Sequence, residues 1–577
     1  MRRGRHARAR THRTRTVAVL GAAVLVVVVG VVVGIDQPWS AQPARATAAA
    51  KDRRGRQAEP ARSRAPVVPA GASDPGIDGP GTYLGTDGVE ASWVVAQNRL
   101  PGTTAWRITG TAPAGAVIEG FANRTAARAG QTVTFYVSTT APTYRVQAFR
   151  MGYYHGTGAH LVWTSPTLTG VDQPACPVAP GVNMVACDNW STSFEVAVTA
   201  AWVQGDYLFK LEGSQGQQQY VPLTVWDPTA SGAYLVKNDV LTWQAWNPFG
   251  GFDYYVGQGS CPPVHYPLCS RARVVSFDRP YGYGQGAGDF LGNEYPLVRW
   301  MEKHGLDVTY ATDVVVTEHP SFLVHQRTVL SLGHDECWDL RERDAIVAAR
   351  HAGVNVVFFA ASAILRHVRL EASPLGPDRQ EVDYRNPAKD PLDGHGNPLE
   401  VTGNTWASPP ANWPESPFVG ESYGGFLEPG SPPAPLVVAD AVPWLFAGTG
   451  LHAGSSVPGV LINDFDELGP AGTFPSNVEV LAHSPIPLSE VQTDLATSGG
   501  SAFSDLTYYT DPTSEAGVFD SGTNNWIPAL AACPSSGSSC PAPALRRITG
   551  NLFHLFGQGP AGHLEPSQPN WQQFLVG

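Results

Sequence analysis

An uncharged run of nineteen residues near the N-terminus is the strongest constraint on this chain. Residues 17–35 read VAVLGAAVLVVVVGVVVGI and follow sixteen residues that contain seven arginines and no acidic side chain. At about 1.5 Å per helical residue, the run nearly spans a bilayer core of about 30 Å. Arginines on one flank predict that residues 1–16 stay in the cytoplasm and that the rest lies outside it. We therefore expect a single-pass protein of the cell membrane, anchored through residues 17–35.

A cleaved signal peptide is the alternative, with Ala44-Arg45-Ala46 as its cleavage site, and it would make the protein secreted. The apolar region of such a peptide is usually shorter, about 7–15 residues, which favours the retained anchor. Residues 36–88 are rich in Pro, Ala, Gly and Arg and show no hydrophobic period, so we predict a flexible tether.

The charge distribution separates the N-terminal segment from the rest of the chain. The whole chain carries a net charge of −12, whereas residues 1–66 alone carry an excess of 11 positive charges, so residues 67–577 hold about −23. A strongly acidic folded part argues against a nucleic-acid-binding function, because phosphate backbones are bound by Lys and Arg.

Six of the seven cysteines fall into close pairs, Cys176/Cys187, Cys261/Cys269 and Cys533/Cys540. Each pair could close a short loop as a disulfide in an oxidising compartment, which agrees with export. A zinc site is the alternative, but the spacings are too wide for CxxC knuckles and no cluster of histidines accompanies them. Cys337 is left over and is predicted to be a free or buried thiol.

Two folded domains follow the tether. Residues 89–228 contain short alternating runs separated by Gly, Pro and Asn, the pattern of an antiparallel β-sandwich. The runs are AWRITGTA, VIEGFANRT, TVTFYVST, YRVQAFRMGYY, SFEVAVTA, YLFKLEG and YVPLTVWD. The sandwich shows no catalytic constellation.

Residues 229–577 form the second domain, in which strands alternate with helices. Strands are predicted at 272–278, 307–311, 327–332 and 354–360, and helices at 289–304 and 340–351. Asp339 and Glu342 have capping-box spacing at the start of the second helix. The alternation predicts an α/β domain with a mainly parallel, amidotransferase-like sheet. Residues 385–577 read as loop-rich additions with scattered strands.

The loop Gly333-His334-Asp335-Glu336-Cys337 follows a predicted strand and precedes a helix. In open α/β sheets, binding sites lie at the carboxyl ends of strands. His334, Asp335 and Glu336 could supply a metal ligand, a general base or both. A helix cap with surface charges is one alternative, and a nucleophilic Cys337 at the strand-to-helix turn is another.

Several longer segments resemble a known family. LTWQAWNPFGGFDYY, VSFDRPYGYGQGAGDFLGNEYPLVRWMEKHGLDVTYATDV, VLSLGHDECW and AARHAGVNVVFFAASAI are similar to the large (β) subunit of N,N-dimethylformamidase and its relatives. RQEVDYRNP, WLFAGTGLHAG, SDLTYYT and VFDSGTNNW also fit, and the resemblance covers roughly residues 115–557.

The resemblance implies hydrolysis of amide-type C–N bonds with a mononuclear Fe³⁺ ion held by two tyrosines and a glutamate. By motif these ligands would be Tyr255 (or its neighbour Tyr254), Tyr295 and Glu336, with their three oxygens within about 5 Å of a common point. Phenolate and carboxylate oxygens are hard ligands that suit a ferric ion. His334 would donate a hydrogen bond or carry a proton beside the metal.

The chain also departs from the family pattern. Cys337 stands where the family has Tyr after the glutamate, and Ser362 stands where it has Asn. Asp464 takes the place of a catalytic Glu and is our second catalytic candidate beside His334. The family also implies a separate small subunit or an oligomer as partner, and an unidentified small-molecule substrate.

Three hypotheses follow. The first is an extracytoplasmic, iron-dependent amide hydrolase. The second is a non-catalytic cell-surface binding protein that keeps the fold. The third is an amidotransferase-like hydrolase that depends on Cys337.

Overall fold

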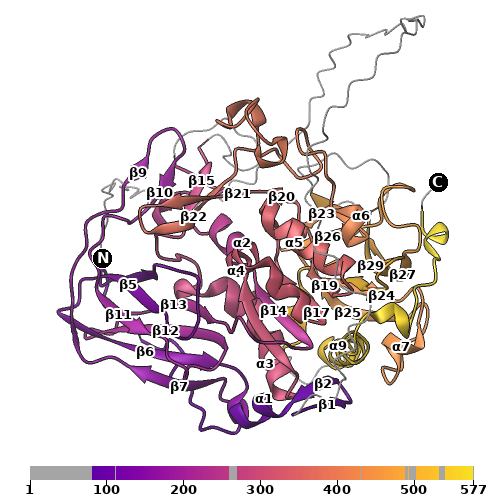
Figure 1. Ribbon diagram of the computed structural model, residues 1–577, viewed down its shortest axis with the longest axis horizontal. Helices are drawn as coiled ribbons and strands as arrows, with labels where there is room; N and C mark the ends of the chain where they lie inside the picture. The colour runs from indigo at the N-terminus through magenta and orange to yellow at the C-terminus, as the bar shows by residue number, and fades with distance from the viewer. Residues whose placement is uncertain are drawn as a thin grey trace, which may run out of the picture. The chain divides into compact units, whose positions relative to one another are not determined.

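The computed structural model describes residues 81–110, 112–258, 270–428, 430–487, 491–492, 502–531 and 540–575. The basic tail, the predicted anchor at 17–35 and most of the tether lie outside these ranges. Within them, no helix is both long and apolar enough to cross a bilayer. The anchor therefore stays a prediction. The described residues form a β-rich assembly of several sheets with comparatively few helices (Figure 1).

Two sheets form the predicted sandwich, and all of their strand pairs are antiparallel except β4 with β13, which is parallel. One has the strand order β11-β5-β3 and the other the order β4-β13-β12-β6-β7, with β8 beside β6. Phe135, Phe209 and Val221 illustrate the core, because side chains from both sheets meet in one buried cluster. The strands are β3 Ile118–Ala122, β4 Ala126–Ala127, β5 Thr132–Thr139, β6 Thr143–Met151, β7 Ala159–Thr164, β8 Leu168–Thr169, β11 Phe194–Ala197, β12 Gly205–Gly213 and β13 Gln218–Val225.

The predicted strand at 105–112 is wrong for the described residues of that run, which form turns and loop. Lys210 Nζ donates to the carbonyl oxygens of Ala105 and Arg107 at 2.9 and 3.0 Å. Tyr220 Oη donates to the carbonyl oxygen of Trp106 at 2.7 Å. Side chains therefore satisfy backbone groups that a sheet would otherwise have paired.

A seven-stranded sheet forms the centre of the second domain, in the order β16-β14-β17-β19-β30-β29-β27. The pairs from β16 to β30 are parallel, and the last two pairs are antiparallel. The strands are β14 Tyr234–Asn238, β16 Val308–Thr312, β17 Thr328–Gly333, β19 Asn355–Ala360, β27 Glu479–Ile486, β29 Ala502–Thr510 and β30 Gly517–Asp520. The predicted mainly parallel sheet is present in this part of the chain.

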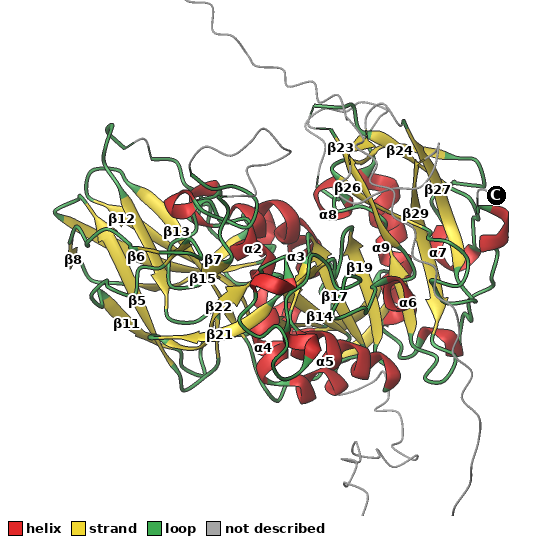
Figure 2. Cartoon of the chain, turned by 90° about the horizontal axis from the view of Figure 1, so that it is seen from above, coloured by secondary structure: helices red, strands yellow, loops and turns green. Residues whose placement is uncertain are grey.

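Helices cover both faces of this sheet (Figure 2). Val357 and Phe359 of β19 point into one core, shared with α2 Val240–Ala245, α3 Tyr295–Lys303, α8 Trp526–Ala529 and α9 Ala542–Phe556. Val356 and Phe358 point into the other, shared with α4 Asp313–Glu318 and α5 Leu340–His351. The strands are buried on both sides, which is why they read as continuous apolar runs.

The predicted strand at 272–278 belongs to another sheet. Its core, β15 Val274–Ser276, pairs antiparallel with β22 Gly376–Val382, which in turn pairs with β21 Arg369–Ser373. The parallel sheet instead begins at β14, a short strand that the sequence pattern did not reveal. The expected helix at 289–304 starts with a π-helical turn, Phe290–Glu294, before α3.

The region expected to be loop-rich, 385–577, contains more regular structure than predicted. It supplies β27, β29 and β30 to the large sheet, and the fifteen-residue helix α9. Smaller elements are α6 Ser416–Val419, α7 Pro443–Phe446, β23 Ser422–Leu427, β24 Ala434–Val437, β25 Ser456–Leu461, β26 Asp464–Glu467 and β28 Val491–Gln492.

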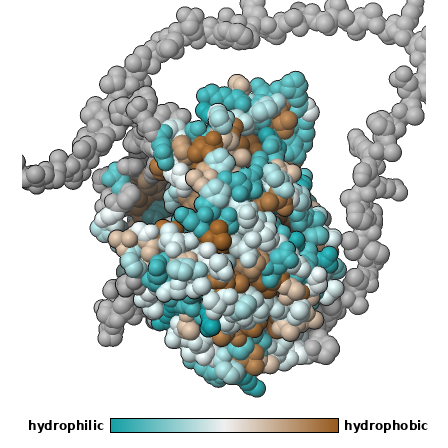
Figure 3. All heavy atoms as spheres, turned by 90° about the vertical axis from the view of Figure 1, so that its left-hand side faces the viewer, coloured by the Kyte–Doolittle hydropathy of each residue, from teal (hydrophilic) through white to brown (hydrophobic). Residues whose placement is uncertain are grey.

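Short elements complete the fold: α1 Ser92–Gln97, β1 Thr82–Gly85, β2 Gly88–Ala91, β9 Val178–Ala179, β10 Met184–Val185, β18 Cys337–Trp338 and β20 Arg366–His367. On the face shown in Figure 3, hydrophobic residues are interspersed with hydrophilic ones. Such mixing is typical of a surface in contact with water.

Candidate active site

The loop that links β17 to α5 carries His334, Asp335 and Glu336 at one edge of the large sheet. Because β17 and β19 are parallel neighbours, their carboxyl ends lie together, and Ser362 follows the end of β19. Asp464, the first residue of β26, reaches the same place, where its Oδ2 lies 3.0 Å from Ser362 Oγ. The cluster therefore occupies the position expected for a site in an open α/β sheet.

Glu336 is the centre of this cluster and contacts four donors. Its Oε2 accepts from Tyr255 Oη at 2.5 Å and from Trp246 Nε1 at 3.1 Å. Its Oε1 accepts from Arg366 Nε at 3.0 Å, and His334 Nε2 lies 3.6 Å from Oε2. Burial would raise the pKa of Glu336, but His334, Arg366 and Tyr255 together hold it below its ordinary value. The carboxylate is ionised and surrounded by donors.

His334 lies between two carboxylates. Its Nε2 is 3.6 Å from Glu336 Oε2 and 3.9 Å from Asp464 Oδ2. Both separations exceed a hydrogen bond, and this buried nitrogen has no hydrogen-bond partner within the described ranges. Burial alone would lower the pKa of His334, but Glu336, Asp464 and Asp289 raise it to about 9. The raised pKa favours the imidazolium form, and the partly exposed side chain carries a buried Nε2 that no described group pairs with.

Tyr255 enters the site from the segment after β14. Its ring stacks on Trp246 with centroids 3.7 Å apart, and the guanidinium of Arg385 lies 4.5 Å from the ring centroid. Burial, and then the charge on Glu336, raises the pKa of Tyr255 above its ordinary value. The phenol therefore stays protonated and donates to Glu336.

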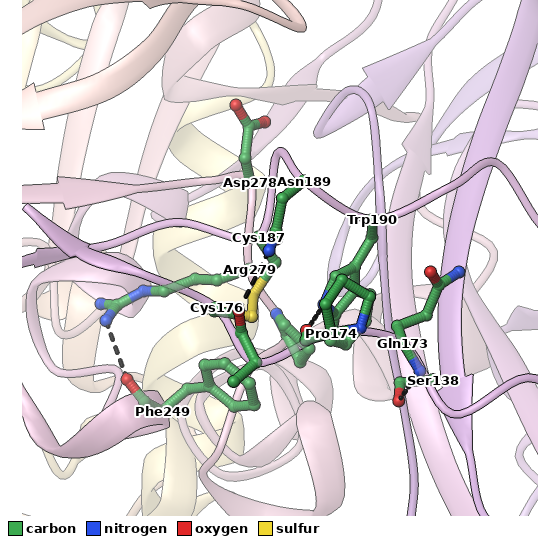
Figure 4. The surroundings of a disulfide bond; sticks show 12 residues. Ser138, Gln173, Pro174, Cys176, Cys187, Asn189, Trp190, Phe249, Asp278 and Arg279 are labelled. Atoms are coloured by element: carbon green, nitrogen blue, oxygen red, sulfur yellow. Dashed lines mark hydrogen bonds between the residues drawn. A yellow bond between two sulfur atoms is a disulfide. The ribbon is translucent and has the colours of Figure 1, made fainter.

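The Cys176–Cys187 disulfide supports the segment that leads to Tyr255 (Figure 4). Both cysteines pack in one apolar cluster with Trp190 and Phe249, and Arg279 donates to the Phe249 carbonyl at 3.0 Å. This pair confirms one of the three predicted disulfides.

The other two predicted disulfides involve residues beyond the described ranges. Cys540 is disulfide-bonded, whereas Cys261, Cys269 and Cys533 lie outside the described residues. Cys337 is free and buried, as predicted. Burial raises the pKa of the Cys337 thiol well above its ordinary value, which opposes thiolate formation and the Cys337-dependent mechanism.

Tyr295 does not reach the cluster. Its hydroxyl donates to the carbonyl oxygen of Gly158 at 2.7 Å and lies 3.1 Å from that of Gly152, both in the sandwich. Its ring packs edge-on against Trp106 at 5.9 Å. The helix that carries Tyr295 turns this side chain toward the sandwich. The alternative tyrosine, Tyr254, donates to the Glu381 carbonyl at 2.5 Å. Of the three expected metal ligands, the structure brings together Tyr255 and Glu336.

These residues do not fit the implied iron group. A second phenolate is missing, and Tyr255 keeps its proton for the Glu336 carboxylate. Both oxygens of Glu336 already accept hydrogen bonds, one of them from the Arg366 guanidinium. Arg366 lies beside Glu336 and Arg385 beside Tyr255, and these two positive charges disfavour the binding of a ferric ion by electrostatic repulsion. Arg385 lies in the family-like segment RQEVDYRNP, but nothing in the sequence pattern places it beside Tyr255, and Arg366 lies outside the recognised segments.

A second acidic group lies deeper in the domain. Oxygens of Asp239, Asp313 and Asp335 lie within 4.8 Å of one another, a spacing that could hold a metal ion. Lys237 Nζ lies among them, at 2.9, 2.5 and 2.9 Å from these three carboxylates and 3.0 Å from Glu342. One ammonium group balances the charge of only one of these carboxylates, and burial raises the pKa of Asp239, Asp313 and Glu342 above their ordinary values, which favours their protonation. Asp335 joins the His334 loop to this cluster.

Residues 145–540 match the family described as N,N-dimethylformamidase beta subunit-like, C-terminal. The chain belongs to this family. The match includes every residue of the cluster around Glu336 and confirms the resemblance seen in the motifs. No curated protein matches the chain.

Solved structures give only weak similarity. A Paenibacillus sp. cycloisomaltooligosaccharide glucanotransferase, solved with cycloisomaltoheptaose, has 13% identity and a TM-score of 0.13 over 22% of this chain. That match spans 16% of the glucanotransferase. A chain in a structure that describes T cell specificity and activation by the bacterial superantigen toxic shock syndrome toxin-1 has 15% identity and a TM-score of 0.12, over 19% of this chain and 99% of that chain.

Proposed function

We propose that this member of the N,N-dimethylformamidase beta subunit-like family hydrolyses amide-type C–N bonds of small, non-peptide substrates. The observation that carries the proposal is His334, whose buried Nε2 lacks a hydrogen-bond partner between Glu336 and Asp464. A buried, charged donor beside two carboxylates is costly to maintain unless something uses it. Family membership supports the reaction class.

Asp464 acts as the general base and His334 as the general acid. Asp464 is 21% exposed at its side chain and accepts the proton of the attacking oxygen. His334 donates through Nε2 to the developing oxyanion and then to the leaving nitrogen. Glu336, held by Arg366, Tyr255 and Trp246, keeps the imidazolium charged and oriented. No step requires the iron ion, for which the ligands do not fit.

In the same proposal, the protein acts outside the cytoplasm. Its support is the apolar run at 17–35 with arginines on its N-terminal side, and the paired cysteines. The Cys176–Cys187 bridge agrees with an oxidising compartment. Dimethylformamide itself is a poor candidate substrate for a membrane-anchored protein, so the test uses a range of amides.

The first prediction concerns His334 and Asp464. With the full chain in detergent and a panel of formamides and small acyl anilides, His334→Gln and Asp464→Asn should each lower kcat by about 10²–10⁴-fold. Both substitutions nearly preserve side-chain volume, so thermal unfolding should change little. Turnover is followed by release of the amine or aniline.

His483, on β27, provides a matched control. Its Nδ1 lies 2.6 Å from Oδ1 of Asp505 on β29, and its side chain is 19% exposed, against 16% for His334. His483→Gln should leave turnover unchanged. A folded wild-type protein that hydrolyses no amide in the panel would favour the non-catalytic binding protein. Full activity in His334→Gln would remove the assigned role.

A further inference from the structure

Ser362 occupies an unusual backbone position in the same cluster. It follows β19 at the carboxyl edge of the sheet and has φ +57°. Ile364, two residues later, also has a positive φ, of +61°. Non-glycine residues rarely adopt this region, and they persist in it where the surroundings enforce it. Such strained strand-end turns present nucleophiles in α/β hydrolases.

We propose that Ser362 is the nucleophile of the hydrolase, forming a covalent acyl-enzyme. This inference rests on the proposed function and names the attacking oxygen. It goes beyond the family pattern, in which the corresponding residue is Asn and offers no hydroxyl.

The contacts of Ser362 match the role. Its Oγ lies 2.6 Å from the Ala361 carbonyl oxygen and 3.0 Å from Asp464 Oδ2, so the hydroxyl can turn from the carbonyl to a carboxylate that can accept its proton. Its backbone N–H donates to Asp466 Oδ1 at 2.8 Å, so the same strand, β26, fixes both the main chain and the hydroxyl. The Ile364 N–H donates to the Asp335 carbonyl at 3.2 Å, which joins the turn to the His334 loop.

Asp464 and His334 are the more exposed members of the cluster. Their side chains are 21% and 16% exposed, whereas Ser362 as a whole is 2% exposed. The motif differs from the usual nucleophile elbow in two ways. Ala360 and Ile364 stand at the two glycine positions of that motif, and the chain continues into β20 instead of a helix.

The reaction balances with residues of this chain alone. Ser362 Oγ bonds to the carbonyl carbon while its proton passes to Asp464. The C–N bond breaks as the nitrogen takes a proton from His334, leaving an ester on Ser362. Water then bonds to the acyl carbon and gives a proton to His334, while Asp464 returns its proton to the departing Oγ. The products are a carboxylic acid and an amine, with both side chains restored.

The experiment uses the full chain and a fluorophosphonate probe, followed by peptide mass mapping. The probe should modify Ser362, and Asp464→Asn should slow the modification at least 10-fold. With p-nitrophenyl acetate, the wild type should release a stoichiometric burst of p-nitrophenol before steady turnover. Ser362→Gly should abolish the label and the burst and lower amide turnover by about 10³-fold or more.

Ser362→Gly is the informative variant because glycine adopts φ +57° without strain, so the fold should be retained. Ser484→Ala, at a buried serine on β27, is the control and should keep label, burst and turnover. Full turnover in Ser362→Gly with loss of activity in His334→Gln would overturn the nucleophile and leave the proposed function standing. A folded wild type that is unlabelled at Ser362 would also overturn it.

Discussion

Glu336 was predicted to be a metal ligand, but in the structure its carboxylate is held by hydrogen bonds. The GHDE segment and its family resemblance predicted a metal ligand, and the residue does lie at the carboxyl edge of the sheet. In the fold, however, Arg366 and Tyr255 donate to its two oxygens, and Trp246 adds a third hydrogen bond. Three hydrogen bonds from residues 30 to 90 positions away in the chain cannot be read from local spacing, because only tertiary packing brings the donors to Glu336.

Buried carboxyl groups outside the site give a prediction at the same scale. Asp206, on β12, is fully buried, and burial raises its pKa from 3.8 to about 7 despite Arg150 nearby. The folded state therefore holds a proton that the unfolded chain loses above pH 4. The free energy of unfolding therefore does not depend on this group below pH 4. Between pH 4 and about 7 it falls by on the order of 4 kcal/mol, because the unfolded chain loses the proton that the folded state keeps.

Asp206→Asn should remove this pH dependence. Chemical denaturation at pH 4 should give similar unfolding free energies for wild type and variant, and at pH 8 the variant should be the more stable. Two stability curves that run parallel across this interval would contradict the pKa shift.

At the scale of elements, the sequence pattern performed best where an element is long or capped. The runs at 327–332, 354–360 and 340–351 correspond to β17, β19 and α5 within one residue at either end. Strand β14 was missed, although β16, which also has five residues, was predicted. Helix α9 was missed because Ile548, Thr549 and Gly550 lower its helix propensity, whereas burial of its apolar face stabilises it.

The cap of α5 provides the prediction for this scale. Asp339 accepts from the Glu342 N–H at 2.8 Å, as its spacing predicted, and also from Thr317 Oγ1 at 2.8 Å. Asp339→Ala should lower the free energy of unfolding by about 1–3 kcal/mol, because a helix N–H and a buried hydroxyl both lose an acceptor.

Asp339→Asn keeps an acceptor and should cost clearly less. Asp344→Ala, at an exposed position of the same helix, should stay within about 0.5 kcal/mol of wild type. Denaturant titration of the three variants checks this order, and an Asp339→Ala protein as stable as the Asp344→Ala control would contradict the capping role.

At the scale of the whole described fold, the sandwich and the α/β domain share a buried contact. Arg150 of β6 forms a two-pronged ion pair with Glu302 of α3, at 2.6 and 3.0 Å, and both side chains are fully buried. Tyr310 Oη donates to the same Glu302 carboxylate at 2.7 Å. Phe149 and Leu208 of the sandwich belong to the same apolar core as α3. The two regions should therefore unfold together.

Removing one partner of this pair leaves a buried, uncompensated charge. Arg150→Met and Glu302→Leu should each destabilise the protein by about 3–5 kcal/mol, and the double variant should recover part of that loss. Calorimetry should show one cooperative transition in the wild type. Two well-separated transitions, or additive losses in the double variant, would contradict the coupling.

The sequence by itself determined the class of the protein and the regions of its fold. Apolar alternation predicted the sandwich, and continuous apolar runs that alternate with helices predicted the parallel strands, since both patterns are local properties of the chain. Ordered motifs such as GHDEC indicated the family and the edge of the sheet that carries the site. Tertiary structure alone decided which side chains meet there. Tyr295 turns to the sandwich, Arg366 and Trp246 take the oxygens of Glu336, and Ser362 meets Asp464. Such meetings depend on contacts between segments far apart in the chain, and no local pattern encodes them.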